Sequence, residues 1–445
     1  MGQLFGTDGI RGVANTELTP ELVVGLGRAL VRTLREEGRT RPQVLVGRDP
    51  RASGEMLESA LVAGVTSAGG DVVSAGVLPT PGVAYLTAET TADAGAMISA
   101  SHNPVADNGI KFFGPEGGKL TDDEERRIEE LLQHVADDRP VGAHIGRLRR
   151  DHELLVRYVE HLATTGSENL SNLHVVLDCA NGAASNVAPF VLRRLGAHVD
   201  VLNAKPDGTN INAGCGSTHP EVVARAVVEA GADIGLAHDG DADRLIAADH
   251  LGNIVDGDFI LAILAEDLRQ QRDLDTVVTT VMTNLGFTLA MRDLGIEVIQ
   301  TQVGDRYVRE AMLAGGHPLG GEQSGHIIFT DYATTGDGVL TAICLLSVLA
   351  GSGRSLADLA GIMQRLPQVL VNVRGVDRDR LADATAVWRA IEDESEALGD
   401  QGRILVRASG TEPVIRVMVE ADSEPHATEV AERLSKVVSA ELSLD

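Results

Sequence analysis

The sequence predicts an α/β protein with three related α/β domains and a smaller C-terminal α+β domain. Two observations carry this prediction. A strand, a polar loop, a helix and a second strand follow one another at three places in the chain of 445 residues. After Leu366 and Pro367 the pattern changes, and short strands alternate with two long helical stretches. A chain of this length also exceeds what one hydrophobic core supports, so several domains are expected.

The three repeats are recognised by apolar strands that flank a loop and a helical stretch. The predicted strands lie at 44–46 and 72–75, at 175–177 and 198–202, and at 277–282 and 297–301. The helices between them lie at 55–67, 187–195 and 287–294. A further apolar strand in each repeat leads into a polar loop, at 99–104, 239–244 and 321–326. Because ligands of open α/β sheets gather at the carboxyl ends of strands, we expect the three loops to face one cleft.

The domain boundaries follow from breaks in these patterns. A charged stretch at 137–150, a turn at 251–253 and residues 366–367 indicate junctions. The predicted domains are 1–155, 156–255, 256–368 and 369–445. The last contains predicted strands at 369–373, 404–407 and 414–420 and helices at 381–396 and 427–442.

Composition excludes several classes of partner. Lys and Arg total 38 against 65 Asp and Glu, and this net charge of −27 disfavours binding to nucleic acid or to anionic membranes. Aromatic residues make up only 3%, and no apolar run approaches the 18 or so residues that span a bilayer. The three cysteines are scattered, and the first residues resemble neither an export signal nor a lipidation site, so we expect the cytoplasm.

Asp239, Asp241 and Asp243 alternate with small residues directly after an apolar run, a pattern suited to a divalent metal at a strand end or loop. A calcium-binding EF-hand loop is excluded, since its sixth position would be Arg244 instead of Gly and its twelfth His250 instead of Glu. Hard oxygen ligands predict Mg²⁺. A solvated acidic turn is the alternative.

Ser101 lies in a Ser-His-Asn-Pro turn just past the strand of the first repeat, where its hydroxyl can act as a nucleophile or a phosphoryl carrier. A simple turn-forming role is the alternative. The Asp triplet in the matching loop of the next repeat favours the carrier, because a phosphate on Ser101 would supply the metal with a further anionic ligand.

Other polar groups are suited to binding phosphate or sugar. Near the C-terminal end, two guanidinium groups, two hydroxyls and a glycine form a predicted anion cradle. These residues are Arg407, Ser409, Gly410, Thr411 and Arg416. Glu322 and Ser324 could accept from and donate to sugar hydroxyls, with a helix N-cap as the alternative. Arg11, Lys111 and His326 are weaker candidates, since each alone could be an ordinary cation or core residue.

Taken in order, the segments 6–12, 99–104, 239–244, 321–326 and 407–416 resemble the α-D-phosphohexomutase superfamily along the whole chain. The opening Gly-Thr-Asp-Gly-Ile-Arg-Gly and Gln323 are most similar to the branch of bacterial phosphoglucosamine mutases. The resemblance implies a heart-shaped enzyme of four domains around a central cleft, with mixed sheets, closure of the fourth domain and a hinge near Leu366.

The implied reaction interconverts glucosamine 6-phosphate and glucosamine 1-phosphate, an intramolecular phosphotransfer in UDP-N-acetylglucosamine and cell-wall precursor synthesis. Ser101 would carry the phosphoryl group and pass it through a sugar bisphosphate, with one Mg²⁺ held by the Asp triplet and a phosphoserine oxygen. Phosphoryl transfer would be assisted by Arg11, Lys111 and His326. The substrate would be bound by Arg244, Glu322, Ser324 and the anion cradle. A sugar bisphosphate or a kinase would activate Ser101, and the family suggests a homodimer.

Three alternatives stay open at this point. The nearest is a mutase that prefers mannose or glucose phosphates. A metal-dependent phosphatase would use Ser101 but release inorganic phosphate steadily. A non-catalytic phosphosugar sensor would keep the cradle and tolerate the loss of Ser101.

Overall fold

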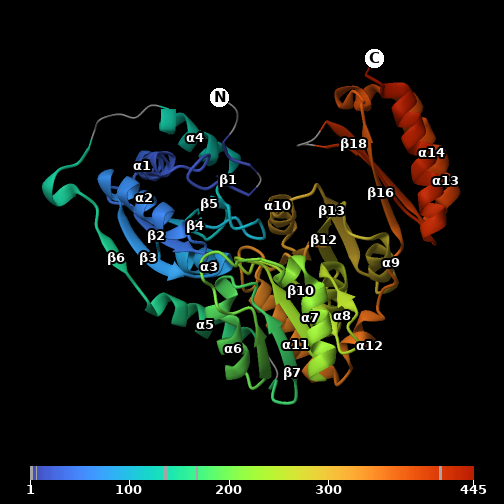
Figure 1. Cartoon of the computed structure of the whole chain (residues 1–445), viewed down its shortest axis with the longest axis horizontal. Helices are drawn as coiled ribbons and strands as arrows, with labels where there is room; N and C mark the ends of the chain where they lie inside the picture. The colour runs from blue at the N-terminus through green and yellow to red at the C-terminus, as the bar shows by residue number, and fades with distance from the viewer. Residues whose placement is uncertain (1–3, 7, 134–138, 167–168, 410–412, 445) are drawn as a thin grey trace. The chain divides into compact units, whose positions relative to one another are not determined.

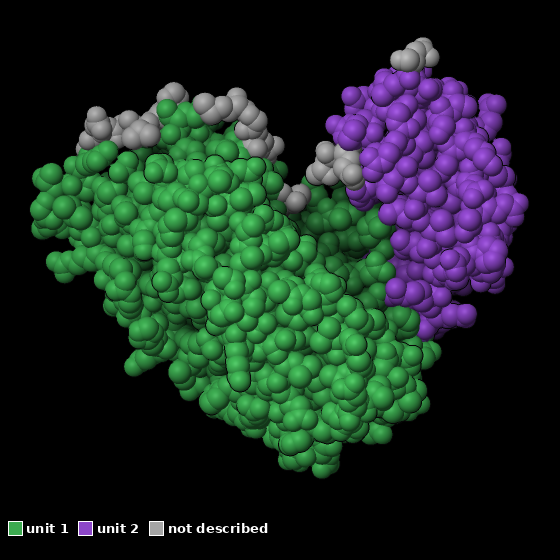
Figure 2. Space-filling view, viewed as in Figure 1, with its two compact units in different colours: residues 1–282, 296–362 green, residues 283–295, 363–445 purple. Residues whose placement is uncertain are grey.

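The computed structural model describes residues 4–6, 8–133, 139–166, 169–409 and 413–444 (Figure 1). The chain divides into two compact units (Figure 2). Unit 1 comprises Met1–Met282 and Ile296–Ile362, and unit 2 comprises Thr283–Gly295 and Met363–Asp445. None of the helices in the described part of the chain is both long and apolar enough to cross a membrane.

Three mixed sheets build unit 1. The first has the strand order β1-β5-β4-β2-β3-β6, the second β11-β10-β9-β7-β8, and the third β13-β12-β14-β15. The strands of the first sheet are β1 (Ile10–Val13), β2 (Gln43–Arg48), β3 (Asp71–Val77), β4 (Ala94–Ile98), β5 (Asp107–Phe113) and β6 (Leu148–Arg150). Those of the second are β7 (His174–Asp178), β8 (His198–Leu202), β9 (Ile234–His238), β10 (Leu245–Asp249) and β11 (Ile254–Val255). The third contains β12 (Thr276–Thr280), β13 (Glu297–Thr301), β14 (Leu319–Gly321) and β15 (Ile327–Phe329).

The three sheets share one arrangement of four strands. A central strand (β2, β7 or β12) lies between two parallel neighbours, and one of these neighbours pairs with an antiparallel strand through a hairpin. The hairpins join β4 to β5, β9 to β10 and β14 to β15. The predicted threefold repeat is therefore confirmed, and the three polar loops of the sequence occupy equivalent hairpins.

Helices cover these sheets. In unit 1 they are α1 (Pro20–Glu36), α2 (Gly54–Ser67), α3 (Thr80–Glu89), α4 (Asp122–Gln133), α5 (Glu153–Thr165), α6 (Ala188–Arg194), α7 (Pro220–Ala230), α8 (Gly257–Arg272), α10 (Asp305–Gly315), α11 (Gly338–Ser352) and α12 (Leu356–Ala360). Helix α1 illustrates why they form: Thr19 caps it by accepting from the Leu22 amide, and Pro20 occupies its first turn. Its buried stripe, including Leu26 and Leu30, packs beside α2 in the first core.

Two of the predicted junctions contain secondary structure. Within the stretch 137–150, Leu148–Arg150 forms β6, which pairs parallel with β3 at the edge of the first sheet. Its residues are all exposed, so no apolar alternation revealed a strand. The turn 251–253 closes the hairpin between β10 and β11.

Unit 2 contains an antiparallel sheet in the order β16-β18-β17, formed by β16 (Gln368–Arg374), β17 (Arg403–Ala408) and β18 (Val414–Glu420). Helices α13 (Thr385–Leu398) and α14 (Glu424–Leu442) lie along it (Figure 1). Helix α9 (Leu285–Asp293) follows β12 in sequence but belongs to unit 2, because Glu420 accepts from Asn284 Nδ2 at 3.1 Å and from the Leu285 amide at 2.9 Å.

Candidate active site

The first two hairpins of unit 1 bring Ser101 and the Asp triplet together. The Ser101 hydroxyl donates to Asp239 Oδ2 at 2.5 Å, although 138 positions separate the two residues. Ser101 is buried, as are Asp239, Asp241 and Asp243. A hydroxyl and three carboxylates removed from water thus share one small volume of the protein.

The three aspartates have the donor set of a hard divalent cation. One carboxylate oxygen from each lies within 4.8 Å of the others. Asp241 Oδ1 and Asp243 Oδ1 are buried without a hydrogen-bond partner among the described residues, which costs about 1–3 kcal/mol per group. Burial raises the pKa of Asp239 well above its usual value, and the neighbouring Asp243 and Asp241 charges add to the effect. A bound cation would satisfy these oxygens and offset their repulsion, so the residues fit a metal.

The triplet lies directly after β9, as its sequence pattern predicts, but the chain there is not extended. The Ala242 amide donates to the Asp239 carbonyl at 3.2 Å, and Ala242 has a left-handed φ of 58°. A tight turn therefore makes the carboxylates converge, rather than the two-residue alternation of a strand.

Lys111 on β5 lies against the triplet. Its Nζ donates to Asp241 Oδ2 at 3.1 Å and is 3.6 Å from Asp243 Oδ2. Burial lowers the pKa of Lys111, but the two aspartates outweigh this and raise it above its usual value. Thr80, at the start of α3, also donates to Asp241 Oδ2 at 2.6 Å. Lys111 is therefore held as an ammonium beside the Asp triplet.

Arg51, which sequence reasoning missed, holds the Ser101 turn. Its fully buried guanidinium donates to the carbonyl oxygens of Ser101 and Asn103 at 2.9 Å and to those of Pro104 and Asp107 at 2.5 and 3.1 Å. Four carbonyls of one loop thus converge on a single side chain. Ser101 itself has a φ of 52°, a left-handed conformation that costs about 1–3 kcal/mol and needs support from its surroundings.

Three further residues complete this support. Asp49 accepts from Arg51 Nε at 2.9 Å and from Ser99 Oγ at 2.6 Å, and Ser99 Oγ in turn accepts from the Ser101 amide at 2.9 Å. Asn212, from the second repeat, donates to the Ser101 carbonyl at 2.9 Å. The Ser101 amide is therefore held by its near neighbour Ser99, whereas the Ser101 carbonyl is held by side chains remote in sequence.

The third hairpin carries Glu322, Ser324 and His326 between β14 and β15. Ser324 Oγ donates to Glu322 Oε2 at 3.3 Å, and no helix begins there, so the N-cap alternative fails. Burial raises the pKa of Glu322. This hairpin also meets the second, since the Leu245 amide donates to the Gly325 carbonyl at 3.1 Å.

His326 links the third hairpin to the Asp triplet. Its Nδ1 is 3.6 Å from Asp243 Oδ2, and its Nε2 accepts from the Gly336 amide at 3.0 Å. Burial lowers the pKa of His326, but Asp243 and Asp305 outweigh it and raise the pKa to about 9. His326 Nε2 also lies 3.5 Å from Asp305 Oδ2, so each ring nitrogen has a carboxylate nearby.

An ion-pair chain that the sequence did not reveal joins the first and third repeats. Lys119 Nζ lies 2.9 Å from Asp8 Oδ1 and 2.6 Å from Asp305 Oδ2. Arg11 pairs with the same Asp8 at 3.1 Å, while its buried Nε has no hydrogen-bond partner among the described residues. Arg11 lies on β1 opposite Gly109 of β5, two residues before Lys111.

Arg244 lies directly against the triplet that precedes it. Its amide donates to Asp239 Oδ1 at 3.3 Å, and its Nε is 3.8 Å from Asp243 Oδ1. The guanidinium therefore adds a second positive charge beside the carboxylates of the second hairpin.

The predicted anion cradle lies in unit 2. Arg407 on β17 and Arg416 on β18 occupy directly opposite positions in the ladder. Burial and the Arg416 charge lower the pKa of Arg407, and such a like-charged pair favours an anion between its members. Ser409 is buried, and its carbonyl accepts from Arg378 Nη1 at 2.6 Å. Gly410 and Thr411 lie outside the described residues.

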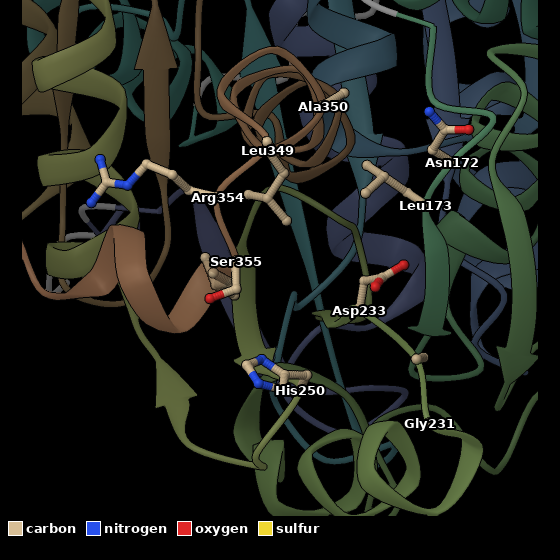
Figure 3. A pocket seen from close by; sticks show the side chains of 12 residues that line it. Asn172, Leu173, Gly231, Asp233, His250, Leu349, Ala350, Arg354 and Ser355 are labelled. Atoms are coloured by element: carbon tan, nitrogen blue, oxygen red, sulfur yellow. The ribbon is translucent and has the colours of Figure 1, made fainter.

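A separate cavity of about 590 Å³ lies elsewhere in unit 1 (Figure 3). Its lining includes Leu173, Asp233, His250, Leu349 and Arg354, and it contains none of the residues that surround Ser101.

Comparison with known proteins identifies the family. Models of the phosphoglucomutase/phosphomannomutase family match residues 2–139 (α/β/α domain I), 156–252 (α/β/α domain II), 256–366 (α/β/α domain III) and 370–437 (C-terminal domain). The chain belongs to the phosphoglucomutase/phosphomannomutase family.

Relatives of this family cover the whole chain. A protein of Mycolicibacterium gilvum named phosphoglucosamine mutase is 55% identical over 99% of this chain and 100% of its own length. One of the same name from Desulforudis audaxviator is 56% identical over 99% of this chain and 98% of its own length. The crystal structure of a phosphoglucomutase/phosphomannomutase family protein from Burkholderia thailandensis has a TM-score of 0.83 and 25% identity, covering 99% of this chain and 97% of that one.

Proposed function

We propose that this phosphohexomutase interconverts glucosamine 6-phosphate and glucosamine 1-phosphate through a phosphoserine enzyme and a sugar bisphosphate. The observation that carries the proposal is the 2.5 Å contact between Ser101 Oγ and Asp239 inside a buried trio of aspartates. The name shared by relatives that are 55% identical along the chain supports glucosamine over mannose or glucose. The reaction belongs in the cytoplasm, on the route to UDP-N-acetylglucosamine and cell-wall precursors.

The proposed metal ligands are Asp239, Asp241, Asp243 and an oxygen of phosphorylated Ser101. Mg²⁺ is the preferred ion, because the protein offers only oxygen donors. When bound, it would neutralise charge on the transferring phosphoryl group.

In the proposed cycle, the bond between phosphorus and Ser101 Oγ breaks as the free oxygen of the sugar monophosphate forms a new bond to phosphorus. The bisphosphate then turns over and returns its other phosphoryl group to Ser101. Lys111, which is protonated, would donate its proton to the leaving serine oxygen and would regain a proton from the attacking sugar hydroxyl, so the protons balance. Arg11 would stabilise charge on the phosphoryl oxygens. His326 is the second candidate for proton transfer. A sugar bisphosphate or a kinase would supply the first phosphoryl group.

Substrate binding is assigned to two sets of side chains. Glu322 and Ser324 are proposed to contact ring hydroxyls, with Arg244 beside them. The anion cradle is proposed to bind the phosphate that does not react. Its residues are Arg407, Ser409, Gly410, Thr411 and Arg416.

The test compares the 1-phosphates of glucosamine, mannose and glucose as substrates of the purified chain with Mg²⁺. We expect the highest kcat/KM for glucosamine 1-phosphate and conservation of the phosphoryl group. Equal or better turnover of mannose 1-phosphate would overturn the substrate assignment, and steady release of inorganic phosphate would indicate a phosphatase instead.

A further inference from the structure

Two histidines and an aspartate meet on the second sheet, away from the triplet of the active site. Among the described residues, His174, His198 and Asp200 form the second group whose ligand atoms all lie within 4.8 Å of one another. His174 is partly buried, whereas His198 and Asp200 are exposed. The cluster has no part in the proposed mutase reaction.

Strand register explains why these side chains meet. His174 begins β7 and His198 begins β8, and the two are direct partners in a parallel ladder, with Asp200 two residues further along β8. Residues two apart on a strand project to the same face, so all three side chains share one face of the sheet. The imidazole rings have centroids 4.4 Å apart, and His174 Nε2 lies 2.9 Å from Asp200 Oδ2.

The chemistry of the group differs from that of the Asp triplet. Two imidazole nitrogens and one carboxylate match the ligands of Zn²⁺, Co²⁺ and Ni²⁺, whereas Mg²⁺ prefers oxygen alone. The Asp200 side chain retains 52% exposure and that of His174 27%, so a cation can enter from solvent and keep water as a further ligand.

The surrounding charge is mixed. The positive charge of Arg193 acts on Asp200, but Arg193 Nη2 donates a hydrogen bond to the Val199 carbonyl at 2.9 Å. The hydrogen bond from His174 lowers the pKa of Asp200. The net charge of −27 also attracts cations to the protein as a whole.

We propose that His174, His198 and Asp200 bind a zinc-class divalent cation at a second metal site that ties the edge strand β8 to β7. Among the described strands, β8 is the edge strand of this sheet and pairs with β7, so a metal ligated from both strands would add a cross-link at the edge. The site is independent of the proposed mutase activity.

The test measures zinc bound per chain by equilibrium dialysis of the full-length protein, with Mg²⁺ in excess to fill the Asp triplet. Wild type should bind one zinc more than His198→Ala. Asp200→Asn, which keeps the shape of the side chain, should lower zinc affinity by at least about tenfold. His219→Ala is the matched control, because His219 is partly exposed and is also paired with a carboxylate, Glu221, at 3.2 Å, yet it lies outside the cluster.

Thermal unfolding gives a second measurement on the same variants. Zinc should raise the Tm of wild type and His219→Ala but not that of His198→Ala. Equal zinc binding by wild type and His198→Ala would overturn the proposal, since any zinc would then be held elsewhere. An unchanged wild-type Tm in saturating zinc would overturn the cross-link.

Discussion

Arg51→Lys tests whether a buried guanidinium holds the proposed phosphoryl carrier in place. Arg51 makes five side-chain contacts, one to Asp49 and four to carbonyls of the Ser101 loop. An ammonium has three hydrogens at one point and cannot span them, so at least two contacts are lost. Each buried acceptor left without a partner costs about 1–3 kcal/mol, which gives about 2–6 kcal/mol. Asn212 still donates to Ser101 and Asn103, so the lower half of that range is expected.

Three measurements test this prediction. Urea unfolding should show the loss of stability, and steady-state kinetics should show a fall in kcat larger than the change in KM, because Arg51 positions Ser101 and binds no substrate. Hydrogen exchange of the amides at 101–107 should accelerate, since the loop opens locally.

Arg48→Lys is the matched control for this substitution. Arg48 lies three residues earlier and pairs with Glu55 and Glu58 at 3.0 Å, so its conservative replacement should cost at most about 1 kcal/mol. Equal stability, equal kcat and equal loop exchange in the two variants would refute the argument.

Three further predictions concern the metal, pH and the ion-pair chain. Asp241→Asn should weaken Mg²⁺ binding by at least about tenfold in calorimetry, and an unchanged affinity would remove Asp241 from the ligand set. Burial raises the pKa of Asp337 from 3.8 to about 6, so its contribution to stability is complete below pH 4 and is lost as pH rises through 6. The free energy of unfolding is measured against pH for wild type and Asp337→Asn, both at saturating Mg²⁺. Relative to the variant, wild type should lose about 3 kcal/mol between pH 4 and 7. Parallel stability curves for the two proteins would contradict this. Lys119→Met leaves Asp8 and Asp305 without their shared cation and should lower the free energy of unfolding by about 3 kcal/mol. The control is Lys436→Met on the exposed face of α14, which should leave this free energy nearly unchanged. Equal stability of the two variants in urea unfolding would argue against a stabilising role of the ion-pair chain.

The sequence predicted the repeat and the three polar loops because both depend on local patterns. Alternating aspartates behind an apolar strand are visible in a short window, and so is a Ser-His-Asn-Pro turn. Arg51 escaped notice because its partners lie about 50 residues further along the chain. The available signal was its place just past the carboxyl end of the first central strand, where ligands of open α/β sheets gather.

Lys119 and Asp305 were missed for a related reason. They are 186 residues apart, and charged residues of these types are usually solvated, so only the packing of two repeats shows that they pair. Strand β6 was missed because an exposed edge strand needs no apolar alternation.

The most direct test of the phosphoryl carrier maps phosphate on the purified chain after incubation with glucosamine 1,6-bisphosphate and Mg²⁺. Intact mass and peptide mass spectrometry should show one phosphoryl group, located on Ser101 and absent from Ser101→Ala. Phosphate on another residue, or its persistence in Ser101→Ala, would contradict the assignment of Ser101 as the carrier.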